Sequence, residues 1–146
     1  MLTPSLEDYL EEIYRFSSQK DVVRVTDISH RLDVAMPSVT KALRKLKEQG
    51  YIAYQRYGVI TLTEQGNLAG TFLVARNQII QDFLTCLYAD CNIPAEAEAI
   101  EHYLSATTIK TFRDLVNFMK ENPDIHQKLQ EYLIMQNKKD SAYAKS

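Results

Sequence analysis

The part of the sequence that most restricts the fold is a run of two short helical segments followed by two β-prone segments. Residues 26–32 and 37–49 show the apolar spacing of helices, only a few residues separate them, and Gly50 is well suited to end the second helix. Residues 51–63 then hold two β-prone stretches around a turn, which predicts a hairpin. A helix-turn-helix followed directly by a hairpin predicts a winged helix.

The charge of this region differs from that of the rest of the chain. Residues 20–62 carry eight Lys or Arg against four Asp or Glu, whereas the whole chain has a net charge of −2. A basic segment with a predicted recognition helix indicates double-stranded DNA as a partner, although a winged helix that contacts proteins is the alternative. The predicted DNA-binding residues are Pro37, Ser38, Thr40, Lys41, Arg44 and Lys45 on the second helix and Arg56 on the wing.

Two carboxylates and an imidazole lie close together later in the chain. Glu98, Glu101 and His102 follow the spacing i, i+3, i+4, so on a regular helix extending to about residue 104 they would share one face. This pattern fits half of a metal site, or else an exposed acidic face with one histidine. Asp8 and Glu11 form a similar pair in the first helix, where Asp8 could instead be a first-turn carboxylate that complements the helix dipole.

The overall pattern predicts a mainly α protein, in which an N-terminal winged helix-turn-helix precedes a helical dimerisation domain. We expect residues 1–64 to form the first domain and 65–146 the second, with a long linker helix at about 65–88. The broad apolar stripe of that helix exceeds what a small winged helix covers, which predicts a homodimer. We also expect Ser5 and Thr26 to be helix N-caps. The polar residues 136–146 should be frayed.

Composition and motifs argue against several other classes of protein. No apolar run approaches the ~18 residues of a membrane span, and the start of the chain lacks the features of a secretory signal. Cys86 and Cys91 match neither a zinc pattern nor a disulfide framework, so a cytoplasmic protein is expected. Paired carboxylates can perform acid–base catalysis, but no nucleophile motif or glycine-rich phosphate loop accompanies them. We therefore do not expect an enzyme.

Four spaced motifs resemble the DtxR/MntR family of metal-dependent transcriptional repressors. They are residues 3–14, 37–41, 62–66 and 100–105, and the similarity extends to about residue 120. Because no SH3-like domain follows the predicted dimerisation helices, the chain is most similar to the short manganese-type branch.

The resemblance implies a binuclear manganese site, and five positions match its ligands. These are Asp8, Glu11, Glu98, Glu101 and His102. The family's linker-helix histidine is replaced by Asn77, and a nearby position that is often acidic is Gln81. An asparagine carbonyl is a weaker ligand than imidazole, so Asn77 is a weak or lost ligand position. One ion with a second bound loosely, one ion only, or no response to metal all remain open.

The functional expectation is a cytoplasmic, homodimeric repressor that binds operator DNA when Mn²⁺ or Fe²⁺ occupies this site, with one or two ions per subunit. Oxygen-rich ligation with a single histidine suits either ion. Four carboxylates from different segments repel one another until a cation neutralises them, so metal binding should fix the arrangement of the recognition helices. The alternative is a winged-helix regulator with a degenerate metal site, which acts independently of metal or through another ligand or partner.

Overall fold

The computed structural model describes residues 2–55 and 58–144, which form two compact units. The first unit comprises residues 1–75 and the second residues 76–146, so the division falls inside the long helix α4 (Glu64–Cys86). The predicted domain boundary after residue 64 lies at the start of this helix. Arg56, the predicted wing residue, lies outside the described residues.

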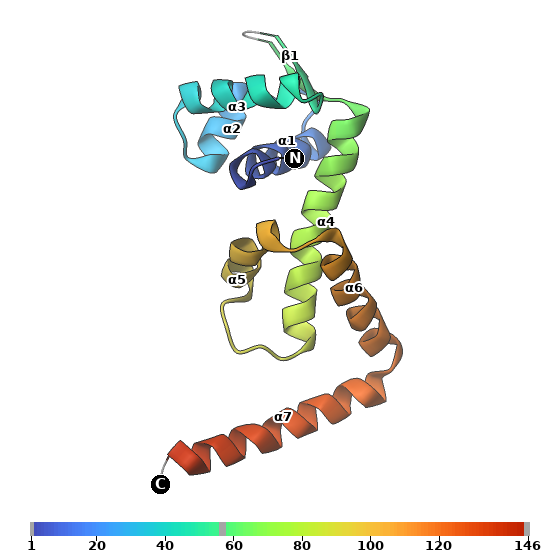
Figure 1. The fold of residues 1–146 in the computed structure, drawn as a ribbon. Helices are drawn as coiled ribbons and strands as arrows, with labels where there is room; N and C mark the ends of the chain where they lie inside the picture. Colours follow the sequence, from blue (N-terminus) through green and yellow to red (C-terminus); the bar gives the residue numbers. More distant parts are fainter. Residues whose placement is uncertain (1, 56–57, 145–146) are drawn as a thin grey trace. The chain divides into compact units, whose positions relative to one another are not determined.

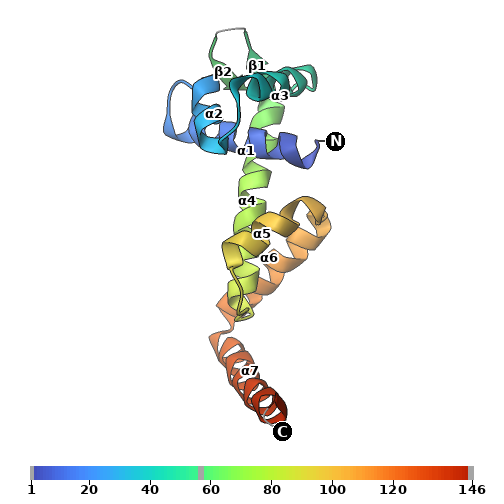
Figure 2. The same ribbon diagram turned by 90° about the vertical axis from the view of Figure 1, so that its left-hand side faces the viewer.

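The first unit has the predicted winged-helix order (Figures 1 and 2). Its elements are α1 (Pro4–Gln19), α2 (Val25–Leu32), α3 (Met36–Glu48), β1 (Ile52–Tyr54), β2 (Ile60–Leu62) and the beginning of α4. The two strands are antiparallel, with Ile52 opposite Leu62 and Tyr54 opposite Ile60. The predicted fold class is confirmed, since a helix-turn-helix and hairpin precede a helical second unit.

The core of the first unit forms where α1, α2 and α3 meet the hairpin. Leu10 and Ile13 from α1, Ile28 from α2 and Leu43 from α3 are fully buried. Val39, Ala42 and Leu46 complete the inward face of α3 that the helical spacing predicted. The polar face of α3 is therefore turned outward by packing of the apolar face.

Two helix starts differ from the sequence-based expectation. The N-cap of α1 is Thr3, whose Oγ1 accepts from the backbone N–H of Leu6, and not Ser5. Pro4 occupies the first turn, where its missing N–H costs nothing. Helix α2 begins at Val25 and not after Thr26, because the carboxylate of Asp27 accepts from the backbone N–H of Arg24 at 2.9 Å.

Two glycines allow α4 to leave the hairpin and cross α1. A Cβ at Gly66 would lie 1.8 Å from the carbonyl oxygen of Tyr51, and one at Gly70 would lie 2.7 Å from the Cβ of Tyr14. The hydroxyl groups of Thr71 and Tyr14 form a hydrogen bond at 3.1 Å, one residue beyond the second glycine. The start of α4 is thus held against the winged helix by backbone approaches that only glycine permits.

In the part that the structure describes, the regular elements of the second unit are all helices. After the rest of α4 come α5 (Ile93–Ile100), the 3₁₀ helix η1 (Glu101–Tyr103), α6 (Ala106–Glu121) and α7 (Pro123–Ala144). Ile80, Ala97 and Ile109 form its buried centre. The rings of Phe83 and Phe112 stack with their centroids 3.8 Å apart, which joins α4 to α6.

Helix α7 corrects the expectation of a frayed C-terminal tail for residues 136–144, and residues 145–146 lie outside the described residues. It continues without interruption to Ala144, although none of its described residues is buried. Its first turns are anchored, since Nε2 of His126 lies 2.8 Å from the carbonyl oxygen of Cys86 and the His126 ring stacks on Tyr88. Among the described residues, no helix is long and apolar enough to cross a membrane.

We predict that Gly66→Ala destabilises the protein by about 1–3 kcal/mol, because the added methyl group collides with the Tyr51 carbonyl. This loss outweighs the gain of about 1 kcal/mol in helix propensity. Chemical denaturation followed by circular dichroism measures the change. Asn67→Ala, at an exposed position one residue further along α4, is the control and should change stability little. A Gly66→Ala protein as stable as the parent would contradict the close approach.

Asp27 gives the winged helix a pH-dependent stability. The Lys20 ammonium, which donates to Asp27, and the Arg24 backbone N–H hold the pKa of the Asp27 carboxyl below its usual range. A lowered folded pKa stabilises the protein above the ordinary value of about 3.9, and this stabilisation is lost as pH falls through the lowered value. Asp27→Asn should cost about 1 kcal/mol at neutral pH.

The difference between Asp27→Asn and the parent should shrink as pH falls below about 4, as measured by urea unfolding at several pH values. The control is Asp21→Asn, at an exposed position in the loop between α1 and α2. If the difference in unfolding free energy stays constant across this pH range, the lowered pKa of Asp27 is not its cause.

Candidate metal centre

Glu101 and His102 are placed by a change in helix type at the end of α5. Helix α5 ends at Ile100, and the chain tightens into the 3₁₀ helix η1. With 3.0 residues per turn, a 3₁₀ segment does not keep the i, i+3, i+4 face of a regular α-helix. Glu101 is only 2 % exposed and His102 is half-buried, whereas Glu98 lies on the exposed side of α5. The structure thus brings two of the three residues of this stretch together.

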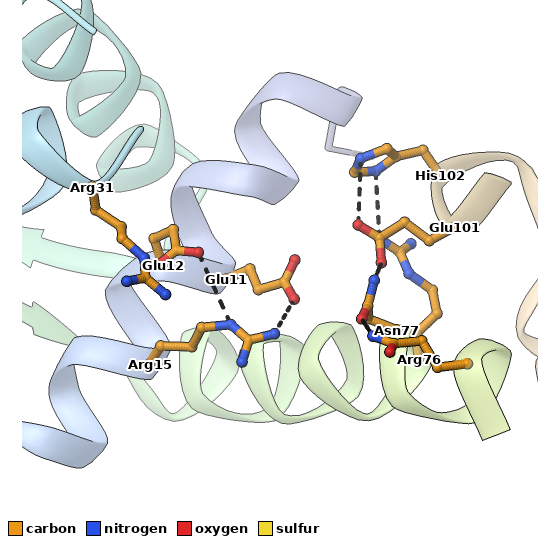
Figure 3. Close-up of polar contacts among 9 residues, drawn as sticks. Glu11, Glu12, Arg15, Arg31, Arg76, Asn77, Glu101 and His102 are labelled. Atoms are coloured by element: carbon orange, nitrogen blue, oxygen red, sulfur yellow. Dashed lines mark hydrogen bonds and ion pairs between the residues drawn. The ribbon is translucent and has the colours of Figure 1, made fainter. Parts of the chain in front are cut away.

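Glu101 lies at the centre of a polar network with residues of α4 (Figure 3). The side-chain amide of Asn77 donates through Nδ2 to Glu101 Oε2 at 2.8 Å, and Gln81 Nε2 donates to Asn77 Oδ1 at 2.7 Å. The other carboxylate oxygen, Oε1, lies 3.7 Å from His102 Nε2. Asn77 and Gln81 therefore form a hydrogen-bonded pair that is directed at the candidate ligand Glu101.

The imidazole of His102 is oriented by an arginine. Arg76, which is 3 % exposed, brings Nη2 to 3.4 Å from His102 Nδ1. Arg76 therefore lies against the Nδ1 edge of the ring, and Nε2 is the ring nitrogen on the side of Glu101. Sequence reasoning did not identify Arg76, although an arginine in the apolar stripe between Leu73 and Ile80 is the signal that would have marked it.

The remaining candidate ligands, Asp8 and Glu11, lie one turn apart on α1 in the first unit. Glu11 is 7 % exposed and accepts from Arg15 Nη2 at 2.8 Å. The adjacent Glu12 pairs with Arg31 at 3.3 Å. Burial raises the pKa of the Glu12 carboxyl above its usual value, against the opposing effect of Arg31. Helix α1 therefore carries a set of carboxylates that arginines partly neutralise.

The chemistry of these donors fits a divalent first-row metal. A buried carboxylate beside an imidazole supplies the oxygen and nitrogen ligands that Mn²⁺ and Fe²⁺ accept. A buried carboxylate is also costly unless it is paired, hydrogen-bonded or bound to a cation. Within the second unit, Glu101 and His102 are the residues that would hold such an ion.

The predicted DNA-contacting face is exposed on α3. Pro37, Ser38, Lys41, Arg44 and Lys45 are all exposed. Thr40 is half-buried, and its hydroxyl donates to the carbonyl oxygen of Met36 at 3.1 Å. A shallow hollow beside these residues is lined by Thr40, Arg44, Lys47 and Tyr54. Sequence reasoning did not single out Tyr54, whose place in a strand of the hairpin brings it next to α3.

A winged helix with a basic recognition face, joined to a helical unit that carries a buried Glu–His pair, defines a metal-responsive DNA-binding regulator. Comparison with known families agrees with this class of protein. Residues 1–60 match the family model "Iron dependent repressor, N-terminal DNA binding domain", and residues 63–130 match "Iron dependent repressor, metal binding and dimerisation domain". The chain belongs to this iron-dependent repressor family of metal-dependent transcriptional regulators, and it is not an enzyme.

Individual relatives support the same assignment. The chain is 43 % identical over 131 residues to the HTH-type transcriptional regulator MntR of Lysinibacillus sphaericus. This match covers 89 % of this chain and 94 % of the relative. It is 38 % identical over 132 residues to the MntR of Listeria innocua, and this match covers 90 % of this chain and 93 % of the relative. The resemblance to the DtxR/MntR family is thereby confirmed.

One solved structure of similar fold is the manganese regulator SloR, with a TM-score of 0.68 and 25 % sequence identity. Another is the metal-dependent transcriptional regulator MtsR, with a TM-score of 0.71 and 26 % sequence identity. Each match covers 80 % of this chain and 55 % of the solved chain. The chain thus spans about half the length of these two proteins.

Proposed function

We propose that this chain is a homodimeric repressor that binds operator DNA when Mn²⁺ or Fe²⁺ occupies a centre built around Glu101 and His102. The observation that carries the proposal is the burial of Glu101 beside His102, in the unit that matches the family's metal-binding and dimerisation model. In this proposal residues 1–64 bind DNA in the cytoplasm, and residues 65–146 bind metal and dimerise.

Manganese is the favoured ion. The relatives at 38–43 % identity are named MntR, and one solved structure of similar fold, 27 % identical with a TM-score of 0.67, is titled a manganese-dependent transcriptional repressor in complex with manganese. The donor types agree with this choice, because carboxylate oxygens and one imidazole suit Mn²⁺ without excluding Fe²⁺.

The proposed switch couples the ligands of the two units. Asp8 and Glu11 on α1 would complete the ligand set with Glu98, Glu101 and His102, and the bound ion would supply the positive charge that lets these carboxylates approach. Helix α1 packs on α3 in the core of the first unit. Fixing α1 would therefore select one spacing of the two recognition helices in a dimer, matched to operator half-sites.

A second candidate function is regulation that does not depend on metal. The observation that favours it is that Asn77 and Arg76 already contact Glu101 and His102. Such contacts stabilise the pair without a cation, so a partner or small molecule would then control DNA binding. Titration of Mn²⁺ during DNA binding separates the two candidates, because only the first predicts a gain in affinity.

We predict that Glu101→Gln and His102→Ala each weaken Mn²⁺ binding at least about 10-fold and abolish the metal-dependent gain in DNA affinity. Isothermal titration calorimetry measures metal binding, and fluorescence anisotropy with an operator duplex selected by the metal-loaded protein measures DNA affinity. The control is Glu96→Gln, an exposed first-turn carboxylate of α5 that should leave both unchanged. Undiminished stimulation by Mn²⁺ in Glu101→Gln would count against the proposed centre.

We also predict that Lys41→Ala and Arg44→Ala weaken DNA binding and reduce its dependence on salt. Each lost phosphate contact should lower the slope of log affinity against log salt concentration by about 0.9. Lys128→Ala on the exposed surface of α7 is the charge-matched control and should keep the parental slope. If the α3 variants also keep it, α3 does not lie against DNA.

A further inference from the structure

The amides of Asn77 and Gln81 form a hydrogen-bond chain whose direction is fixed by the carboxylate at its end. A carboxylate only accepts hydrogen bonds, so the atom of Asn77 that lies 2.8 Å from Glu101 Oε2 must be its NH₂ group. The carbonyl oxygen of Asn77 then points away from Glu101 and accepts from Gln81 Nε2 at 2.7 Å. Reversing the Asn77 amide would place two acceptors against each other at Glu101 and two donors at Gln81.

This direction decides what position 77 offers to a cation. An NH₂ group carries hydrogens and no available lone pair, so it cannot be a metal ligand. The Asn77 carbonyl, which could bind a hard ion, is already engaged by Gln81. Asn77 therefore faces the centre as a neutral donor.

The hydrogen bond from Asn77 gives the two carboxylate oxygens of Glu101 different neighbours. Oε2 is held by Asn77, whereas Oε1 is the oxygen on the side of His102, 3.7 Å from Nε2. A second cation on the Oε2 side would have to displace the Asn77 amide, because its NH₂ hydrogens already occupy that side. An ion held together with His102 would therefore meet Glu101 on the Oε1 side.

We propose that Asn77, held by Gln81, is a positioning residue that limits the centre to one divalent cation per chain. The inference rests on the proposed function, since it specifies how many ions that centre takes. Asn77 acts through Glu101 without touching the ion. In the metal-free protein the same hydrogen bond stabilises the buried carboxylate, so Asn77 also contributes to the stability of the second unit.

The first test counts bound Mn²⁺ on the full chain by equilibrium dialysis and elemental analysis at saturating Mn²⁺. The parent should bind one ion per chain. Asn77→His and Asn77→Asp should bind two, because each replaces the amide donor by a side chain that can ligate metal. Asn67→His, which adds an imidazole at an exposed position of the same helix, is the control and should bind one. Circular dichroism confirms that each variant is folded.

Two results would overturn the inference. A parent chain that binds two ions would refute it and leave the proposed metal-dependent function standing. A count of one in both Asn77 variants, with a folded protein, would show that position 77 does not set the number. A parent that binds no Mn²⁺ at all would instead refute the proposed function, and with it the premise of the inference.

A second measurement tests the hydrogen bond itself in the absence of metal. Asn77→Leu removes the donor to Glu101 Oε2 and should lower the melting temperature of the metal-free protein by several degrees. Gln78→Leu, at the exposed neighbouring position on α4, is the control and should change it little. Equal melting temperatures for Asn77→Leu and the parent would contradict the role assigned to Asn77.

Discussion

The second unit is organised around the burial of one carboxylate. Glu101 is 2 % exposed, and a charge removed from water in this way requires partners of matching chemistry. Asn77 supplies a hydrogen-bond donor to one oxygen, and His102 lies beside the other. The change from α5 to the 3₁₀ helix η1 places both Glu101 and His102 at this point. The metal centre that we propose uses this carboxylate, which is already buried in the fold.

Helix α4 is the element that joins the two tasks of the chain. Its first turns are fitted to the winged helix by Gly66 and Gly70, where backbone and a tyrosine ring approach too closely for any larger residue. Its later turns carry Arg76 and Asn77, which contact His102 and Glu101. One helix therefore begins in the DNA-binding fold and supplies the polar partners of the candidate metal ligands.

Much of the fold could be predicted because its signals are local. The apolar spacing of α3 buries Val39 and Leu43 as expected, and the hairpin follows from β-prone stretches around a turn. Helix ends were less predictable, because several residues near each start can act as caps. Thr3 caps α1 in place of Ser5, and Asp27 draws the start of α2 back to Val25. Helix α7 extends to Ala144, through polar residues that the sequence predicted to be frayed.

The sequence alone determined the winged helix, the resemblance to metal-dependent repressors and the residue types of the candidate centre, because these depend on spacing along the chain. It also marked Asn77 as the departure from the family's ligand set. Only the tertiary structure decided which way the Asn77 amide points, that Arg76 lies at His102, and that Glu98 is exposed while Glu101 is buried. Hydrogen-bond direction and burial depend on neighbours from other helices, and a sequence pattern does not contain them.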